Sequence, residues 1–221
     1  VAGLGALGVA IGEDAASVFE RAEVVIEFAL PEATAHHVVI AGESGTAHVI
    51  GTTGFSADQE AIIRKAGEAA PVVVAPNMSL AVNILFALTK QVAGLLDDRF
   101  DIEIVEMHHK HKVDAPSGTA LGLGRAAAEG RGVNLETVGQ MTRHGHIGER
   151  RRGDIGFATL RGGDVTGDHS VIFAVEGERL ELTHKAASRQ IYARGAVHAA
   201  LWAKDRPVGL YSMFDVLGLS T

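Results

Sequence analysis

The chain of 221 residues is 47% hydrophobic and 21% charged, which is enough apolar sequence for the core of one large domain or two small ones. Its formal charge of −7 excludes the concentrated basic surface that nucleic-acid binding needs, and we interpret the short basic run at residues 150–152 as a solvated loop. The lack of cysteine excludes disulfides and thiolate metal sites, and no apolar run reaches membrane-spanning length. We therefore expect a soluble cytoplasmic protein without a nucleic-acid or membrane partner.

The amino end contains Gly3, Gly5 and Gly8, which satisfy the G-x-G-x-x-G spacing of dinucleotide-binding loops. That fingerprint requires a strand before it and a helix after it. Only two residues precede Gly3, and residues 9–12 have an extended pattern. We therefore predict that these glycines do not contact phosphate groups.

From residue 13 onward, helix and strand patterns alternate. Short apolar runs are typical of buried parallel strands, and Ser56 with Gln59 forms a capping box at a helix start. The predicted elements are a helix at 14–22, a strand at 23–28, a helix at 31–42, a strand at 47–50, a helix at 56–69 and a strand at 72–75. This alternation predicts a parallel sheet wound by right-handed crossovers.

Three loops follow the carboxyl ends of these strands, where parallel sheets bind their ligands. They are residues 28–29, residues 51–53 and residues 75–78. Turn chemistry alone explains a Gly-Thr-Thr-Gly run equally well as an ordinary turn. The three loops are nevertheless candidate ligand contacts.

The second half of the chain has a different pattern. A long amphipathic helix is predicted over residues 79–96 and leads out of the first domain. After a strand from residue 100 and a helix that begins at Ser117, we predict a long loop over residues 129–153 in which His144 and His146 lie on the surface.

Three extended segments follow, at residues 155–161, 169–175 and 179–184, and the last two are joined by a hairpin. They predict an antiparallel or mixed sheet, so the second domain differs in class from the first. Ser188 caps a final helix through residue 201, and an apolar tail follows at residues 207–219.

Anion-binding chemistry is concentrated between residues 103 and 121. The start of a helix presents unpaired N–H groups and a partial positive charge, which suit a carboxylate or phosphate. Ser117 and Thr119 add hydroxyl donors, Gly118 allows close approach, and Lys112 adds a compact positive charge. These residues predict an anion pocket.

His108, His109 and His111 flank this predicted pocket. Imidazole titrates near neutrality, so a histidine beside a bound anion can donate or accept a proton. The same three histidines with Glu106 and Asp114 are also compatible with a zinc-dependent hydrolase, although they lack the helical spacing of zinc motifs and Lys112 would repel the metal.

The sequence of residues 108–120, His-His-Lys-His-Lys-Val-Asp-Ala-Pro-Ser-Gly-Thr-Ala, resembles the signature of the dihydrodipicolinate reductase family of the bacterial diaminopimelate and lysine pathway. Residues 51–55, 75–79, 161–164 and 183–189 also resemble this family. The resemblance therefore covers essentially the whole chain.

This resemblance implies an oxidoreductase that transfers hydride from NADH or NADPH to a conjugated cyclic imine carrying two carboxylates. By the same resemblance, His108 is the general acid and Lys112 the second catalytic residue. The substrate-binding residues that it implies are His109, Lys112, Ser117, Gly118 and Thr119.

The resemblance also implies where the nicotinamide cofactor binds. The family's Gly-rich phosphate loop and the residue that selects NADH or NADPH belong to a first strand-helix-strand unit without a counterpart here, and we expect them upstream of Val1. The residues of this chain expected to bind the cofactor are Phe28, Gly51, Thr52, Thr53, Ala75, Pro76, Asn77, Met78 and Arg189.

The predicted fold class is therefore α/β. Residues 1–78 and 189–221 are expected to form a Rossmann-like cofactor domain that lacks its first βαβ unit, and residues 79–188 an α+β domain for substrate binding and oligomerisation. The resemblance implies hinges near residues 79 and 188 and a homotetramer built through the second domain. A non-catalytic assembly or regulatory module is the alternative, and cofactor titration separates it from a reductase.

Overall fold

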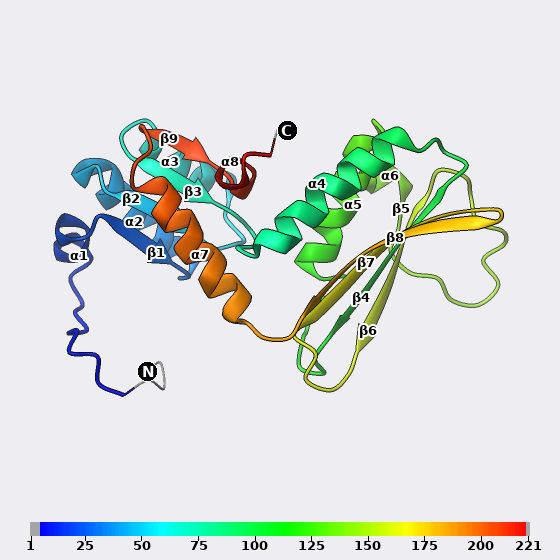
Figure 1. Ribbon diagram of the computed structural model, residues 1–221, viewed down its shortest axis with the longest axis horizontal. Coiled ribbons are helices and arrows are strands. Elements are labelled where there is room, and N and C mark those ends of the chain that lie inside the picture. The colour runs from blue at the N-terminus through cyan, green and yellow to red at the C-terminus, as the bar shows by residue number, and fades with distance from the viewer. Residues whose placement is uncertain (1–4, 220–221) are drawn as a thin grey trace. The chain divides into compact units, whose positions relative to one another are not determined.

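The computed structural model describes residues 5–219 (Figure 1). The chain folds into two compact units. The first unit consists of the chain up to Ala75 and of Ala199–Ser212. The second unit consists of Pro76–His198 and of the chain from Met213 onward. Each unit has its own sheet, one parallel and one mixed, as the sequence predicts for an α/β protein.

The first unit is built on a four-stranded sheet in the order β1-β2-β3-β9, with every neighbouring pair parallel. Its strands and the helices between them alternate as predicted. The bounds are α1 (Ala15–Arg21), β1 (Val24–Glu27), α2 (Pro31–Ser44), β2 (Ala47–Ile50), α3 (Ala57–Ala66), β3 (Pro71–Val74) and β9 (Gly209–Tyr211).

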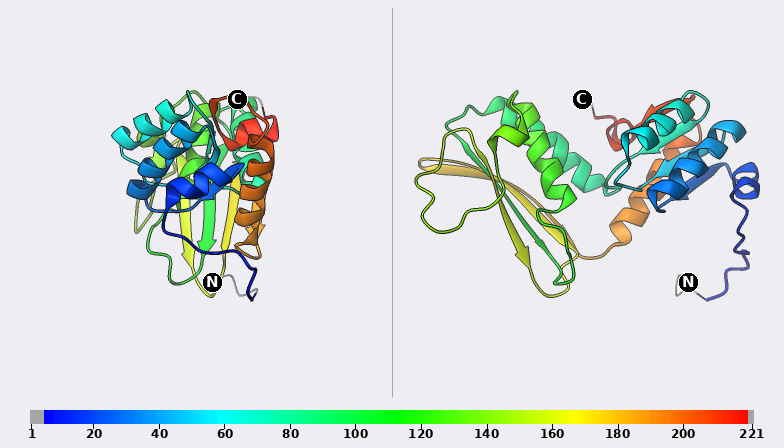
Figure 2. Two further views of the ribbon diagram at one scale, coloured as in Figure 1. Left: turned by 90° about the vertical axis from the view of Figure 1, so that its left-hand side faces the viewer. Right: turned by 180° about the vertical axis from the view of Figure 1, so that it is seen from behind.

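Helices cover both faces of this sheet (Figures 1 and 2). Ile50 and Val72 pack on one face against Val38 of α2 and Ile63 of α3. On the other face lies the carboxyl-terminal part of α7 (Gln190–Ala203). The capping box predicted at Ser56 is formed, with Ser56 Oγ accepting from the Gln59 amide and the Gln59 side chain accepting from the Ser56 amide. The unit is a layered α/β structure with its strand ends open to loops.

The predicted glycine spacing at the amino end falls partly outside the described residues, which exclude Gly3. From Gly5 to Asp14 the chain forms neither helix nor strand, so no helix opens directly after the motif as a dinucleotide fingerprint requires. That these glycines do not bind phosphate stays a prediction.

The second unit contains a mixed sheet in the order β5-β6-β4-β7-β8. β4 runs parallel to β6 and antiparallel to β7, and β7 and β8 form the predicted hairpin. The strands are β4 (Asp101–His108), β5 (Gly139–Gln140), β6 (Ile155–Arg161), β7 (Gly167–Val175) and β8 (Glu178–Ala186); the helices are α4 (Leu80–Leu95), α5 (Gly118–Gly130), α6 (Leu135–Val138), the start of α7, and α8 (Met213–Leu217).

The central strand β4 has two faces of different character. Ile102 and Ile104 are fully buried in a core with residues of α4 and α5, while the residues between them are partly exposed. This period-two pattern continues to the end of the strand. Glu106 and His108 therefore lie on the same side of the strand as the apolar core, although both are polar.

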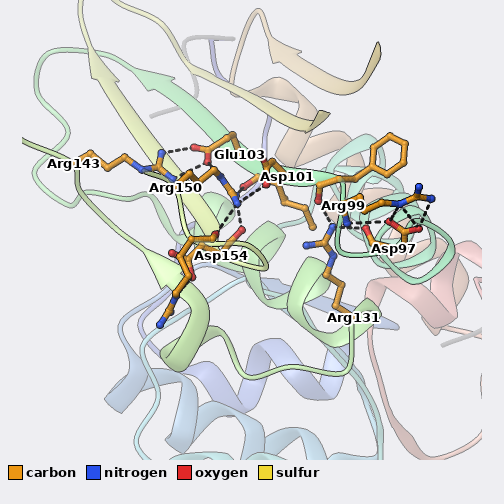
Figure 3. Close-up of polar contacts among 11 residues, drawn as sticks. Asp97, Arg99, Asp101, Glu103, Arg131, Arg143, Arg150 and Asp154 are labelled. Carbon is orange, nitrogen blue, oxygen red and sulfur yellow. Dashed lines mark hydrogen bonds and ion pairs between the residues drawn. The ribbon is translucent and has the colours of Figure 1, made fainter. Parts of the chain in front are cut away.

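The segment predicted as a long loop contains α6 and β5. The interpretation of residues 150–152 as a solvated loop was wrong for Arg150, because its side chain is bound by acidic residues of β4 (Figure 3). Arg150 Nε binds Glu103 Oε1 at 3.0 Å and its Nη1 binds Asp101 Oδ1 at 2.7 Å. Arg143 donates to both carboxylate oxygens of Glu103, at 2.7 Å and 2.8 Å. Acidic side chains on the face of β4 that α4 and α5 do not cover thus hold this segment against the sheet. These ion pairs join residues far apart in the chain, so the local sequence does not predict them.

The apolar tail divides between the units. Residues of β9 pair with β3, whereas Phe214 of α8 packs against the core of the second unit. Within residues 5–219, no helix combines the length and apolar character that crossing a bilayer requires.

Candidate functional site

Glu106 lies at the centre of a polar cluster near the end of β4. Its side chain is 1% exposed. Arg161 donates to both carboxylate oxygens, at 2.8 Å and 2.9 Å, and the Ser117 amide donates to Oε1 at 3.0 Å. Nδ1 of His108 lies 2.6 Å from Oε2. Burial favours the neutral acid, but the hydrogen bonds from Arg161, His108 and Ser117 prevail and lower the pKa of Glu106.

His108 is the last residue of β4 and is nearly buried, with 8% of its surface exposed. Because a carboxylate only accepts hydrogen bonds, its contact with Glu106 requires the proton of the imidazole to be on Nδ1. The ring of His169 meets the ring of His108 edge-on, with 5.0 Å between the centroids. The remaining nitrogen of His108, Nε2, is left for proton exchange with a ligand.

Ser117 is the N-cap of α5, as predicted, but its polar atoms are engaged within the protein. Its Oγ accepts from the Ala120 amide at 3.1 Å and lies 3.1 Å from Nε2 of His169. His169 is 3% exposed, and burial together with the nearby charge of His108 lowers its pKa to about 4. His169 is therefore neutral near pH 7.

The next residues of α5 are more open. Gly118 is exposed, and a Cβ there would meet no other atom within 4 Å. Oγ1 of Thr119 accepts a hydrogen bond from Asn77 Nδ2 at 3.1 Å. The start of this 13-residue helix therefore presents open backbone at Gly118, a suitable place for a carboxylate.

Lys112 lies in the loop between β4 and α5. Its side chain is 21% exposed, and Nζ lies 2.8 Å from Oδ1 of Asp114. The hydrogen bond from Lys112 lowers the pKa of Asp114. The Asp114 carbonyl accepts from Arg161 at 2.6 Å, so the same arginine that binds Glu106 also holds this loop.

His109 lines a cavity of about 590 Å³ within the second unit. Arg189 lies on the same cavity, with Nη2 at 3.5 Å from Nε2 of His109. Desolvation and the positive charge of Arg189 lower the pKa of His109. The residues that line this cavity are His109, Lys110, His111, Gly163, Asp164, Thr166 and Arg189.

The predicted cofactor residues fall into two groups. Pro76, Asn77 and Met78 open the second unit. Asn77 connects to the start of α5 through Thr119, whereas Met78 is 1% exposed, so its side chain belongs to the interior. The buried amide of Asn83, which sequence reasoning missed, donates to the Asn77 carbonyl at 2.8 Å and fixes this loop.

The first unit holds the other group, at the carboxyl ends of β1 and β2. The ring of Phe28 is 57% exposed and lies against Gly51 so closely that a Cβ on Gly51 would overlap it. Thr52 is buried, and its Oγ1 bonds both the amide and the carbonyl of Ala29 at 3.1 Å. An exposed aromatic ring over a glycine backbone offers the flat, open surface that a nicotinamide cofactor requires. Ala75 is buried, and Thr53 is exposed.

A buried acid supports these two loops. Glu27, the last residue of β1, is 8% exposed, and His37 Nδ1 and His48 Nε2 lie 2.8 Å from its two oxygens. Burial opposes ionisation, yet the hydrogen bonds from these histidines lower the pKa of Glu27. Thr34 donates to Glu27 at 3.2 Å and lies 2.9 Å from Oγ1 of Thr52. This network fixes the loop after β1 to the loop after β2.

From the sequence, Glu106 was considered only as a metal ligand. The presence of Arg161 and His169 in this polar cluster was not predicted. Period two along β4 is the signal that puts Glu106 beside His108. His169 had no local signal, because it reaches the cluster through the pairing of β7 with β4, which places it opposite Glu106. Among residues 5–219, no three His, Cys, Asp or Glu side chains gather as a metal site requires.

Comparison with known proteins shows the family of this chain. Residues 1–78 match the family model described as dihydrodipicolinate reductase, N-terminus, and residues 81–217 match dihydrodipicolinate reductase, C-terminus. The 4-hydroxy-tetrahydrodipicolinate reductase of Afipia carboxidovorans is 58% identical over 100% of this chain and 81% of that protein. Its counterpart in Rhodopseudomonas palustris (strain BisA53) is 59% identical over 99% of this chain and 80% of that protein.

Among solved structures, the chain is similar to a dipicolinate-bound dihydrodipicolinate reductase from Paenisporosarcina sp. TG-14. The TM-score is 0.66 at 27% identity, with 87% of this chain and 72% of that chain covered. Both family models and the curated relatives extend over nearly the whole length described above. The resemblance found in the sequence is thus confirmed, and the chain belongs to the dihydrodipicolinate reductase family.

Proposed function

We propose that this chain catalyses the NADPH- or NADH-dependent reduction of 4-hydroxy-tetrahydrodipicolinate, with loss of its hydroxyl group as water, to tetrahydrodipicolinate in diaminopimelate and lysine biosynthesis. Relatives at 58–59% identity carry the name of this reductase. The observation that carries the proposal is the contact of 2.6 Å between His108 and Glu106, next to the open start of α5. A proton donor and an anion site thus lie side by side.

His108 and Lys112 have the catalytic roles. The reduced nicotinamide supplies the hydride when it is bound. His108 delivers a proton from Nε2 to the ring atom of the substrate at which negative charge develops. Lys112 contributes positive charge that stabilises this same charge, and its hydrogen bond with Asp114 holds it in place before the substrate arrives.

The two carboxylates of the substrate require two sets of donors. One carboxylate is assigned to the start of α5, with the amides of Gly118 and Thr119 and the charge of Lys112. His109 and the cavity that it lines are assigned to the remainder of the substrate. Ser117 contributes by fixing the helix start, since its hydroxyl is engaged with Ala120 and His169.

The nicotinamide cofactor is assigned to the loops after β1 and β2. Phe28, Gly51, Thr52 and Thr53 would hold it there, with Thr52 acting as a brace between the loops. Ala75, Pro76, Asn77, Met78 and Arg189 stay predicted contacts.

We also propose a cytoplasmic homotetramer formed through the second unit. Helices α4 and α5 cover one face of the mixed sheet. On the other face Val105 and Met107 are partly exposed, and Leu160, the neighbour of Met107 on β6, is 50% exposed. Sedimentation of the purified protein tests this, and a mass of one 23.1-kDa chain would contradict it.

The activity is tested by mixing the purified protein with 4-hydroxy-tetrahydrodipicolinate and NADPH or NADH and following the loss of reduced-nicotinamide absorbance. We expect turnover that depends on both reactants. A protein that neither binds the reduced cofactor nor shows turnover would instead be the non-catalytic module. The similarity to relatives named as this reductase does not favour a metal-dependent hydrolase.

A further inference from the structure

We propose that Glu106 is the positioning residue of this reaction: it holds His108 in the Nδ1–H tautomer, so that Nε2 is the atom that exchanges the proton with the substrate. This inference rests on the proposed function and assigns a role to a residue that does not itself touch the substrate. Glu106 acts through His108, and Arg161 acts through Glu106.

The first step of the argument is the contact itself. Glu106 and His108 are two residues apart on β4, so their side chains project from the same face of the strand. Nδ1 and Oε2 are 2.6 Å apart, a length typical of a hydrogen bond assisted by charge. With Nδ1 bonded to Glu106, a flip of the imidazole ring would break this short hydrogen bond to a buried carboxylate.

The second step is the state of Glu106. A buried carboxyl group without partners would be neutral and could then donate a proton to Nδ1, which would reverse the tautomer. Here Arg161 binds both oxygens and the Ser117 amide adds a third donor. These donors favour the ionised carboxylate, which can only accept. Arg161 and Ser117 therefore determine the tautomer of His108 indirectly, because they keep Glu106 ionised.

The third step is where Nε2 lies. A Cβ added to Gly167 at the start of β7 would come within 3.0 Å of Nε2, so this glycine leaves room beside the reactive nitrogen. His169 meets the ring from β7 and is neutral near pH 7, because burial lowers its pKa. The charged and titratable groups around His108 are thus Glu106 on its own strand, the Glu106 partner Arg161 from β6, and His169 from β7.

The competing explanation is that Glu106 is purely structural, an ion-pair partner of Arg161 and an anchor for the start of α5. A structural role predicts lost stability and lower activity at every pH. A positioning role also predicts a changed pH profile, since Glu106 bonds directly to the imidazole that serves as the acid.

The test compares the wild-type enzyme with Glu106→Gln, an isosteric change that removes the charge. We expect kcat to fall roughly tenfold to a hundredfold, less than the loss of the acid itself costs. The basic limb of the profile of kcat against pH should move to lower pH. The KM for the cofactor should not change. A variant profile with its basic limb at the wild-type position would overturn the proposal.

A matched control lies on the same strand. Glu103 binds Arg143 and Arg150, as Glu106 binds Arg161, but its side chain projects to the other side of β4. Glu103→Gln therefore removes a carboxylate of the same kind at a distance from His108. We expect its pH profile to match that of the wild type, and an equal shift in both variants would mean that the effect is not specific to Glu106.

A second measurement is independent of turnover and of whether the variant folds. Nitrogen-15 NMR of the imidazoles in the wild-type protein distinguishes a proton on Nδ1 from one on Nε2. At a pH where His108 is neutral, we expect its proton on Nδ1, and a proton on Nε2 would overturn the proposal. If the protein fails to reduce 4-hydroxy-tetrahydrodipicolinate but shows the Nδ1–H tautomer, the proposed function fails while the positioning of His108 by Glu106 stands.

Discussion

The amide of Asn77 and the hydroxyl of Thr119 are joined by a hydrogen bond of 3.1 Å, although 42 positions separate them in sequence. Asn77 follows β3, and Thr119 lies in the first turn of α5. The loop that enters the second unit is therefore fixed directly to the helix start assigned to a substrate carboxylate.

This contact gives the first prediction. Asn77→Ala removes the bond to Thr119 and the bond from the Ser79 amide, and it should raise the KM for the dicarboxylate substrate about two- to tenfold, because the helix start is less firmly held. Steady-state kinetics with the substrate varied measure it. Thr119→Val removes the same bond from the other side. The double variant should be no worse than the more impaired single variant, and additive losses would show that the bond does not couple the two residues.

The second prediction concerns the proton donor. His108→Gln should lower kcat by about two or more orders of magnitude, the usual contribution of a general acid, while cofactor affinity changes little. Turnover measurements and titration with the reduced cofactor separate the two quantities. Wild-type turnover in this variant would remove His108 from its assigned role.

Lys112 gives a third prediction, with a different kinetic pattern. Lys112→Ala should lower kcat and also raise the KM for the substrate, because the ammonium group both stabilises developing charge and binds a carboxylate. Lys185, exposed on β8, provides the control, since Lys185→Ala removes an equal charge elsewhere. If only the KM changed in Lys112→Ala, the lysine would bind substrate without taking part in catalysis.

The fourth prediction concerns packing. A Cβ on Gly195 of α7 would overlap the carbonyl oxygen of Met78, which is backbone and cannot turn aside. Gly195→Ala should therefore lower the free energy of unfolding by about 1–3 kcal/mol, measured by urea denaturation. Gly12→Ala is the control, because a Cβ at Gly12 would meet nothing within 4 Å. Equal stability of the two variants would show that α7 moves away freely.

His169 gives the fifth prediction, on pH dependence. Its pKa is about 4 in the folded protein, lowered by burial and by His108, against about 6.5 in the unfolded chain. Between these values the unfolded chain binds more protons, so stability rises with pH. The contribution of His169 to the free energy of unfolding is fully present above about pH 6.5 and is lost as the pH falls toward 4. The loss is at most about 3 kcal/mol.

The measurement is urea denaturation between about pH 4.5 and pH 7.5. His169→Gln should lose less stability than the wild type as the pH falls through this range. His144, which is exposed, provides the control, and His144→Gln should follow the wild-type dependence. If the curves of His169→Gln and the wild type are parallel, His169 is not neutral in the folded protein.

The local elements of this fold were predictable from the sequence. The strand expected at residues 47–50 is β2 without correction, and Ser56, Ser79 and Ser117 begin helices as predicted. These features depend on neighbours within four positions, where the periodicity of apolar residues and the hydroxyl groups of caps act directly. The motif at residues 108–120 likewise lies on one continuous stretch, and so the family was recognisable.

Tertiary structure decided the partners of those elements. His169 lies beside Ser117 across 52 positions, Arg161 reaches Glu106 across 55, and Arg150 is held by Glu103 across 47. Each contact depends on which strands become neighbours, and strand pairing arises from burial of the whole sheet rather than from any local pattern. The sequence alone thus pointed to the histidine and lysine that we propose perform the chemistry, whereas only the assembled sheet showed the carboxylate that we propose orients the histidine.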